Sequence, residues 1–204
     1  MMKLRTSRQY IIMLFCSMMI SGCLTTHPPV NTLRYSLPEA ETPTDLPPAT
    51  DPAPPMLMLA HIQLADYLDT DRMVIQLDDV SLQATRDHLW REALPEELRR
   101  GLRNRLASRL PHTLISDPVT GQSMSPPRLH LTIDQFHGQL KGYAVLSGQW
   151  YVQSPNQPQR QPHPFHFSTP LAESGYPALV RALGHDLDLL SAQIASQLHH
   201  DVTQ

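Results

Sequence analysis

The sequence predicts an α+β domain in which an antiparallel or mixed β-sheet carries two amphipathic α-helices packed on one side. Segments of continuous or alternating apolar residues, typical of strands, recur within residues 57–84 and 129–168. Two leucine-rich stretches have helical spacing and follow Pro95 and Pro177. The total of 204 residues, 20 of them Pro, accommodates one such domain and an extended N-terminal part.

Three strands are predicted in the first half of the domain. Residues 57–64 are largely apolar, and residues 73–77 are rich in β-branched side chains. After an Asp-Asp turn, Val80, Leu82 and Ala84 alternate with polar neighbours. This spacing of two is the period of a strand.

A pair of longer strands is predicted in the second half. Leu129, Leu131 and Ile133 alternate with polar residues, and the even-numbered residues from 144 to 152 share one face of a second strand. We expect these segments to form a half-buried antiparallel pair. A short strand is predicted around residues 165–168.

The two helices are predicted from their apolar stripes and their proline boundaries. Pro95 suits a first helical position, acidic residues follow it, and Pro111 ends the segment. Leucine recurs there at every fourth position, at Leu94, Leu98, Leu102, Leu106 and Leu110. The apolar residues of the helix that opens at Pro177 fall within about 100° of arc. They are Leu179, Leu183, Leu187, Leu190, Ile194 and Leu198.

The N-terminus is predicted to be a targeting segment. Residues 1–9 are basic, and residues 10–20 form an apolar run with the length of a signal-peptide core. The sequence Ile20-Ser21-Gly22-Cys23 that follows resembles the lipobox of bacterial lipoproteins. This resemblance implies that residues 1–22 are removed and that Cys23 carries covalent lipid. The other interpretation is a secretory signal followed by an unmodified thiol.

A lipidated Cys23 would anchor the mature protein, since two or more acyl chains make release from a membrane slow. Leu24 stands where an Asp would resemble the inner-membrane retention signal, which favours the outer membrane, with the domain facing the periplasm. Cys16 is lost with the signal, so no thiol remains for a disulfide.

The charge of the mature chain argues against nucleic acid as a partner. Removal of residues 1–22 takes three of the 16 basic residues and none of the 19 acidic ones, which leaves a net charge of −6. Lys141 is then the one lysine. Nucleic-acid binding requires a basic face.

Residues 23–55 are predicted to be a lipidated N-terminus with a proline-rich spacer, and residues 56–204 to be the folded domain. Nine of the 28 residues from Pro28 to Pro55 are proline, a composition that favours an extended chain. Residues 33–37 alternate as a strand does and could add an edge strand to the domain. The sequence leaves open whether they do.

No catalytic or metal site is predicted. The 11 histidines include pairs but no spacing typical of a zinc site, so we expect solvated imidazoles and no metal. Nucleophile motifs and phosphate loops are absent from the sequence. The acidic pairs Asp69/Asp71, Asp78/Asp79 and Asp186/Asp188 occur where turns and helix surfaces usually place Asp. We therefore expect no enzyme activity and no cofactor other than the covalent lipid.

Five arginines between residues 99 and 109 allow two interpretations. The acids at the start of the helix and the bases toward its end complement the helix dipole, with long side chains covering the leucine stripe. Alternatively, the arginines form a basic face that docks an acidic partner or lipid headgroups. Charge runs are usually solvated surfaces, which favours the first interpretation.

Four short motifs, in order behind the lipobox, resemble the PqiC-like family of ABC-type transport auxiliary lipoproteins. They lie in residues 64–68, 88–94, 136–150 and 175–183. The motif residues are Tyr67, Leu68, Trp90, Leu94, Phe136, Gly138, Gly142, Gly148, Trp150 and Tyr176. Ala65 and Ala93 depart from the family, where Pro is expected, and this departure questions the local turn geometry.

The resemblance implies a subunit of an intermembrane transport system for lipid or other hydrophobic cargo. The subunit would be anchored in the outer membrane, dock a periplasm-spanning protein with MCE domains and support envelope integrity. An oligomer of this chain would match a symmetric partner. The motif residues would be core residues or partner contacts, and packing is the simpler role for aromatic side chains.

A second hypothesis from a different class is a periplasmic lipid carrier. In a carrier, the sheet and helices would enclose an apolar cavity that itself holds an acyl chain. An apolar content of 41% is not high for a protein that must also line such a cavity. A periplasmic hydrolase would require a nucleophile constellation that the sequence does not contain.

Overall fold

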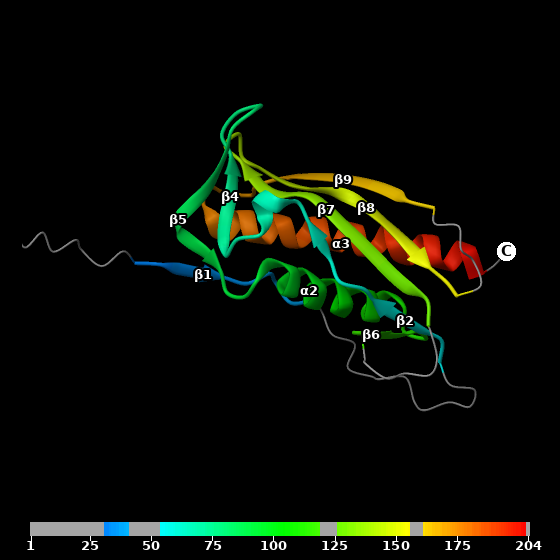
Figure 1. Cartoon of the computed structure of the whole chain (residues 1–204). Helices are drawn as coiled ribbons and strands as arrows, with labels where there is room; N and C mark the ends of the chain where they lie inside the picture. Colours follow the sequence, from blue (N-terminus) through cyan, green and yellow to red (C-terminus); the bar gives the residue numbers. More distant parts are fainter. Residues whose placement is uncertain (1–30, 41–53, 119–125, 156–160, 203–204) are drawn as a thin grey trace, which may run out of the picture. The chain divides into compact units, whose positions relative to one another are not determined.

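The computed structural model describes residues 31–40, 54–118, 126–155 and 161–202 of the chain (Figure 1). Within these ranges, nine strands form one mixed sheet, and two helices, α2 and α3, pack against it. The predicted α+β fold class is confirmed. None of the helices described is both long enough and apolar enough to cross a membrane. The predicted signal peptide, Cys23 and most of the predicted spacer lie outside the described residues.

All nine described strands precede the last helix in the chain. They are β1 (Leu33–Tyr35), β2 (Met56–Leu59), β3 (Gln63–Leu64), the short 3₁₀ helix η2 (Asp66–Leu68), β4 (Arg72–Gln76), β5 (Leu82–Trp90), α2 (Leu94–Arg109), β6 (Leu114–Ser116), β7 (Arg128–Gln139), β8 (Tyr143–Gln153), β9 (His163–Pro170) and α3 (Tyr176–Val202).

The long strand β7 organises the sheet. Along one edge it pairs antiparallel with β8 over its whole length, and β8 pairs in turn with β9. Along the other edge it receives β2, β3 and β4 in succession, all parallel. Beyond β4 come β5 and then β1. The predicted antiparallel pair of strands is confirmed.

Two strand predictions need correction. Residues 57–64 form two short strands, because the chain leaves the edge of β7 between Leu59 and Gln63. An apolar run does not reveal where a ladder is interrupted. Val80 lies in the turn before β5, and its side chain is 86% exposed, so the apolar alternation that begins there does not mark a buried face.

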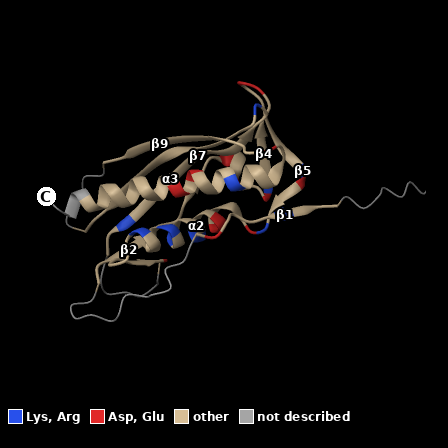
Figure 2. Cartoon of the chain, turned by 180° about the vertical axis from the view of Figure 1, so that it is seen from behind, with Lys and Arg blue, Asp and Glu red and all other residues tan. Residues whose placement is uncertain are grey.

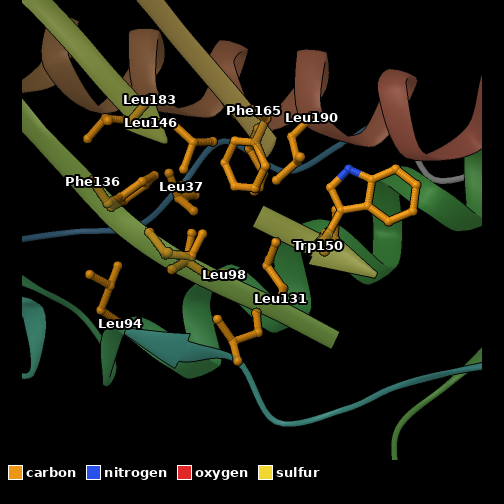
Figure 3. Close-up of a cluster of buried hydrophobic side chains, with 14 of the residues drawn as sticks. Leu37, Leu94, Leu98, Leu131, Phe136, Leu146, Trp150, Phe165, Leu183 and Leu190 are labelled. Carbon is orange, nitrogen blue, oxygen red and sulfur yellow. The ribbon is translucent and has the colours of Figure 1, made fainter. Parts of the chain in front are cut away.

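Both helices have the predicted buried stripes. The leucines of α2 and the predicted stripe of α3 from Leu179 to Ile194 are buried, and Leu198 is half-buried. Figure 3 shows Leu98 of α2 and Leu183 and Leu190 of α3 converging on Leu146 of β8 and Phe136 of β7. These side chains form the core between helices and sheet.

The segment whose role the sequence left open belongs to the folded unit. Strand β1 pairs parallel with β5, so that Leu33 lies opposite His88 and Tyr35 opposite Trp90. Leu37, just beyond the strand, is a core residue (Figure 3). The compact unit accordingly begins at Thr32.

Candidate functional site

The predicted lipidation site, Cys23, lies outside the described residues, so its lipidation stays a prediction. The described chain does place the motif residues. Those residues fall into a buried group, a glycine group and two half-buried tyrosines.

The buried group consists of Leu68, Trp90, Leu94, Phe136 and Trp150, none more than 2% exposed. The ring centroids of Trp90 and Phe136 lie 5.7 Å apart, and Trp150 stacks on His163 at 4.3 Å. Side chains so deeply buried cannot contact a partner in this state. Their positions favour the packing role over partner contact.

The glycines of the motifs are positions of close approach or of a turn. A Cβ atom at Gly148 would lie 2.0 Å from the carbonyl oxygen of Thr132, and one at Gly138 would lie 2.7 Å from a methyl of Leu179 on α3. Gly142 has a φ of +86° in the turn between β7 and β8. Glycine adopts this conformation without steric cost. These three positions shape the sheet and do not present a ligand site.

Tyr67 and Tyr176 are the motif residues that reach the surface. The hydroxyl of Tyr67 donates to the carbonyl oxygen of Asp134 at 2.9 Å, and burial raises the pKa of this tyrosine to about 12. Tyr176 stacks on His88 with 3.6 Å between ring centroids. Burial also raises the pKa of Tyr176. Both phenols therefore stay neutral at physiological pH.

The two alanines that depart from the family keep the backbone geometry that proline imposes. Ala65 precedes η2 with a φ of −60°, and Ala93 precedes α2 with a φ of −55°. Proline fixes φ near −65°. The departure thus leaves the local turn geometry unchanged.

The carboxylate pairs do not converge on a shared site. Asp78 accepts the backbone N–H groups of Val80 and Ser81, at 3.0 and 2.7 Å, which lowers its pKa. Asp186 is buried against Thr169, whereas Asp188 pairs with Arg105. Across the described ranges, no group of three or more His, Cys, Asp or Glu side chains is arranged to hold a metal ion.

The arginines of α2 are engaged by the protein itself. Figure 2 shows basic positions along α2 near acidic positions of α2 and α3. Arg100 pairs with Glu92 and Glu97, and Arg103 pairs with Asp117 at 2.5 Å. The remaining pairs are Arg99 with Glu96 and Asp117, Arg105 with Asp188, and Arg109 with the Ser191 hydroxyl. This pairing disfavours a basic docking face on α2.

A groove of about 460 Å³ lies between α2, α3 and residues 38–40. Charged and polar side chains dominate its wall, among them Arg105, Arg109, Arg181 and Asp188. Such a lining does not suit an acyl chain, which requires an apolar pocket.

An exposed apolar cluster lies at one end of the sheet. We call it the apolar tip. It consists of Leu77, Val80, Leu82, Leu140 and Tyr143, of which Val80 and Leu140 are the most exposed, at 86% and 70%. Leu77 and Val80 lie in the β4–β5 turn, Leu140 lies in the β7–β8 turn, and Leu82 and Tyr143 are the first residues of the strands that follow. The two turns meet at the top of Figure 1.

The tip is held in place by hydrogen bonds between its two turns. The N–H of Leu140 donates to the carbonyl oxygen of Gln76 at 2.9 Å, and the side-chain amides of Gln139 and Gln76 are joined at 2.9 Å. The N–H of Leu77 donates to the carbonyl oxygen of Ser81, which closes the hairpin. Single exposed apolar residues are ordinary. The tip differs in that its five exposed residues lie in or beside two turns that are hydrogen-bonded to each other.

Sequence reasoning missed the apolar tip. The sequence does show an apolar residue within each of the two turns, Val80 after the Asp-Asp pair and Leu140 before Lys141-Gly142. The two turns are neighbours because β4 pairs parallel with β7, and no local sequence pattern reveals this pairing.

Comparison with known proteins gives a family match. A family model described as "ABC-type transport auxiliary lipoprotein component" matches residues 35–195. The intermembrane transport lipoprotein PqiC of Escherichia coli (strain K12) is 25% identical over 179 residues, covering 88% of this chain and 91% of PqiC. PqiC of Shigella flexneri matches to the same extent.

Two solved structures share the fold. One, described as an uncharacterized protein, is 26% identical, with a TM-score of 0.68 over 82% of this chain and 99% of the other. The second, protein XCC0632 of Xanthomonas campestris, is 14% identical with a TM-score of 0.65 and coverage of 84% and 100%. The latter similarity concerns the fold alone.

Proposed function

Because the chain belongs to the ABC-type transport auxiliary lipoprotein family, we propose that it is a non-enzymatic subunit of an intermembrane transport system. Its similarity to PqiC, an intermembrane transport lipoprotein, supports this proposal. In our proposal, lipid on Cys23 anchors the protein in the outer membrane with the domain in the periplasm. Lipid or another hydrophobic cargo passes through the system, and a separate ATPase supplies the energy.

The partner in this proposal is a periplasm-spanning protein with MCE domains. We assign the docking surface to the apolar tip, because its five side chains are exposed in or beside two turns that are hydrogen-bonded to each other. Covering exposed apolar side chains with a partner removes apolar surface from water, which favours association. A partner surface that fits the tip is a concave apolar one. Several copies of this chain docked in this way would form a homo-oligomer around a symmetric partner.

The carrier hypothesis has less support. The residues between helices and sheet fill the space that a cavity would occupy, as Figure 3 shows for Leu98, Leu146 and Leu190. The groove beside α2 is lined by charged groups and lies outside this core.

Substitution of the tip tests the proposal. Val80→Ser with Leu140→Ser is expected to reduce recovery of the MCE-domain protein with the full-length lipidated chain at least tenfold. Leu189→Ser is the control, since Leu189 is an exposed leucine of α3 away from the tip. Equal recovery with both variants would remove the tip from the proposal, and no recovery with any form would contradict the transport partner.

A further inference from the structure

We infer that residues 33–38 form a clasp that fixes the membrane tether to the domain, so that the tether ends at Thr32. This inference rests on the proposed lipidation of Cys23. In this inference, the surface formed by β5, α2 and α3 binds the N-terminal segment of the same chain. The proline-rich residues 41–53 then connect two points of one domain and add nothing to the reach of the tether.

The first part of the clasp is a strand pairing. Strand β1 runs parallel to the end of β5, and the N–H of Arg91 donates to the carbonyl oxygen of Tyr35 at 2.7 Å. The side chains add to this pairing, because a guanidinium nitrogen of Arg34 donates to the carbonyl oxygen of Trp90 at 3.1 Å. The hydroxyl of Tyr35 also lies 2.9 Å from Nδ1 of His88.

The second part is a buried acid aimed at the segment. Glu97 of α2 is 1% exposed, yet it is a charged residue in the first turn of a helix. Its carboxylate accepts the hydroxyl of Ser36 at 3.0 Å and the N–H of Leu37 at 3.4 Å. Buried charges require partners of this kind, and the segment supplies two of them. Arg100 supplies a third at 2.9 Å.

The third part is a buried base that holds the end of the segment. Arg105 is 3% exposed, and its guanidinium donates to the carbonyl oxygen of Pro38 at 3.1 Å. Between these two charged contacts, Leu37 enters the core. Pro38 lies against Gly184 of α3, where a Cβ atom would come within 2.8 Å of the proline ring. Both helices and the sheet therefore contribute to binding six consecutive residues.

The clasp changes the predicted reach of the membrane anchor. The nine residues from Cys23 to Asn31 precede Thr32 and span at most about 30 Å. Were residues 23–55 all free, the 33 residues up to Met56 would span at most about 110 Å. The clasp thus holds the domain close to the membrane surface.

Two matched insertions test the clasp in the full-length lipidated protein on phospholipid vesicles. A 20-residue Gly-Ser insertion is placed after Thr26 or after Thr44. The mature chain offers no free thiol, so a donor dye on Ser196→Cys reports energy transfer to acceptor lipids. We expect the insertion after Thr26 to increase the mean distance between the dye and the membrane surface by about 13 Å. The insertion after Thr44 should leave this distance unchanged. Equal increases would overturn the clasp.

Hydrogen exchange of the unlipidated chain from residue 24 keeps this test separate from the proposed function. We expect the backbone amides of residues 35–37 to exchange at least about 100-fold more slowly than an unstructured peptide. Glu97→Ala should accelerate the exchange about tenfold, whereas Glu96→Ala, its exposed neighbour, should not. Unprotected amides in the parent chain would overturn the clasp. Failure of the full-length protein to float with vesicles would instead contradict the lipid anchor.

Discussion

The carboxylate of Glu97 accepts a hydrogen bond from the hydroxyl of Ser36 at 3.0 Å, although 61 residues separate the two in sequence. Glu97 lies on the first turn of α2, and Ser36 immediately follows β1. A proline-rich stretch that resembles a free spacer is thereby attached to the core at one point.

Loss of this carboxylate should destabilise the fold. Glu97→Ala leaves the Ser36 hydroxyl and the Leu37 N–H without their acceptor in a buried place, which typically costs about 1–3 kcal/mol. Urea denaturation at pH 7 measures the change. Glu96→Ala is the matched control, because that carboxylate is about half exposed and pairs only on the surface, and we expect a change within about 0.5 kcal/mol. If both variants lost the same free energy of unfolding, Glu97 would contribute no more to stability than a surface residue.

Asp186→Asn should stabilise the protein at pH 7. Asp186 is fully buried between α3 and β9, and this burial raises its pKa to about 6. Ionisation in that place opposes folding by up to about 3 kcal/mol. An amide has no charge to bury and can still accept the hydroxyl of Thr169, which lies 2.5 Å from the carboxylate. Thermal denaturation at pH 7 should show a higher midpoint for the variant.

The pH dependence of this effect has a definite sign. The carboxyl of Asp186 binds its proton more tightly in the folded state, so the parent loses stability as pH rises from about 4 to about 6. As pH falls below 3.8, the ordinary pKa of Asp, the acid becomes neutral in both states, and the advantage of the variant should vanish. An advantage that is constant from pH 3 to pH 8 would contradict the role of ionisation.

Gly148→Ala should destabilise the protein more than Gly142→Ala. The new methyl group at position 148 would meet the Thr132 carbonyl oxygen at 2.0 Å, and a backbone atom of a central strand pair cannot move aside cheaply. We expect a loss above about 2 kcal/mol. At Gly142 the space is open and the cost is the left-handed φ alone, about 1 kcal/mol. Guanidinium denaturation of both variants provides the comparison.

Cys23→Ser should mislocalise the protein and abolish function, because the variant cannot carry the proposed acyl chains. Fractionation of cells would then place the variant away from the outer membrane, and detergent sensitivity would report the loss of envelope integrity. Full function of a soluble periplasmic form would contradict the need for an anchor.

The sequence predicts those helices and strands whose apolar residues recur with a regular spacing. The leucines from Leu94 to Leu110 mark the buried face of α2, and alternation marks β7 and β8, because helix and strand periods are local properties. The motif aromatics Trp90 and Trp150 are buried, as the packing interpretation expects.

What the sequence does not predict depends on distant pairing. The division of residues 57–64 into β2 and β3 is set by the edge of β7, some 70 residues later. The clasp depends on Glu97 and Arg105, whose burial is not apparent in a helix rich in charge. The apolar tip needs two turns to meet, which only the tertiary structure brings about.

Site-specific photocrosslinking from the tip tests the proposed docking surface. A photoreactive residue replaces Val80 in the full-length lipidated protein, and crosslinked products purified from membranes are identified by mass spectrometry. We expect an MCE-domain protein to be crosslinked from Val80, and no such product from the same probe at Leu189. Recovery of only lipid or other copies of the chain from Val80 would contradict the proposed docking surface.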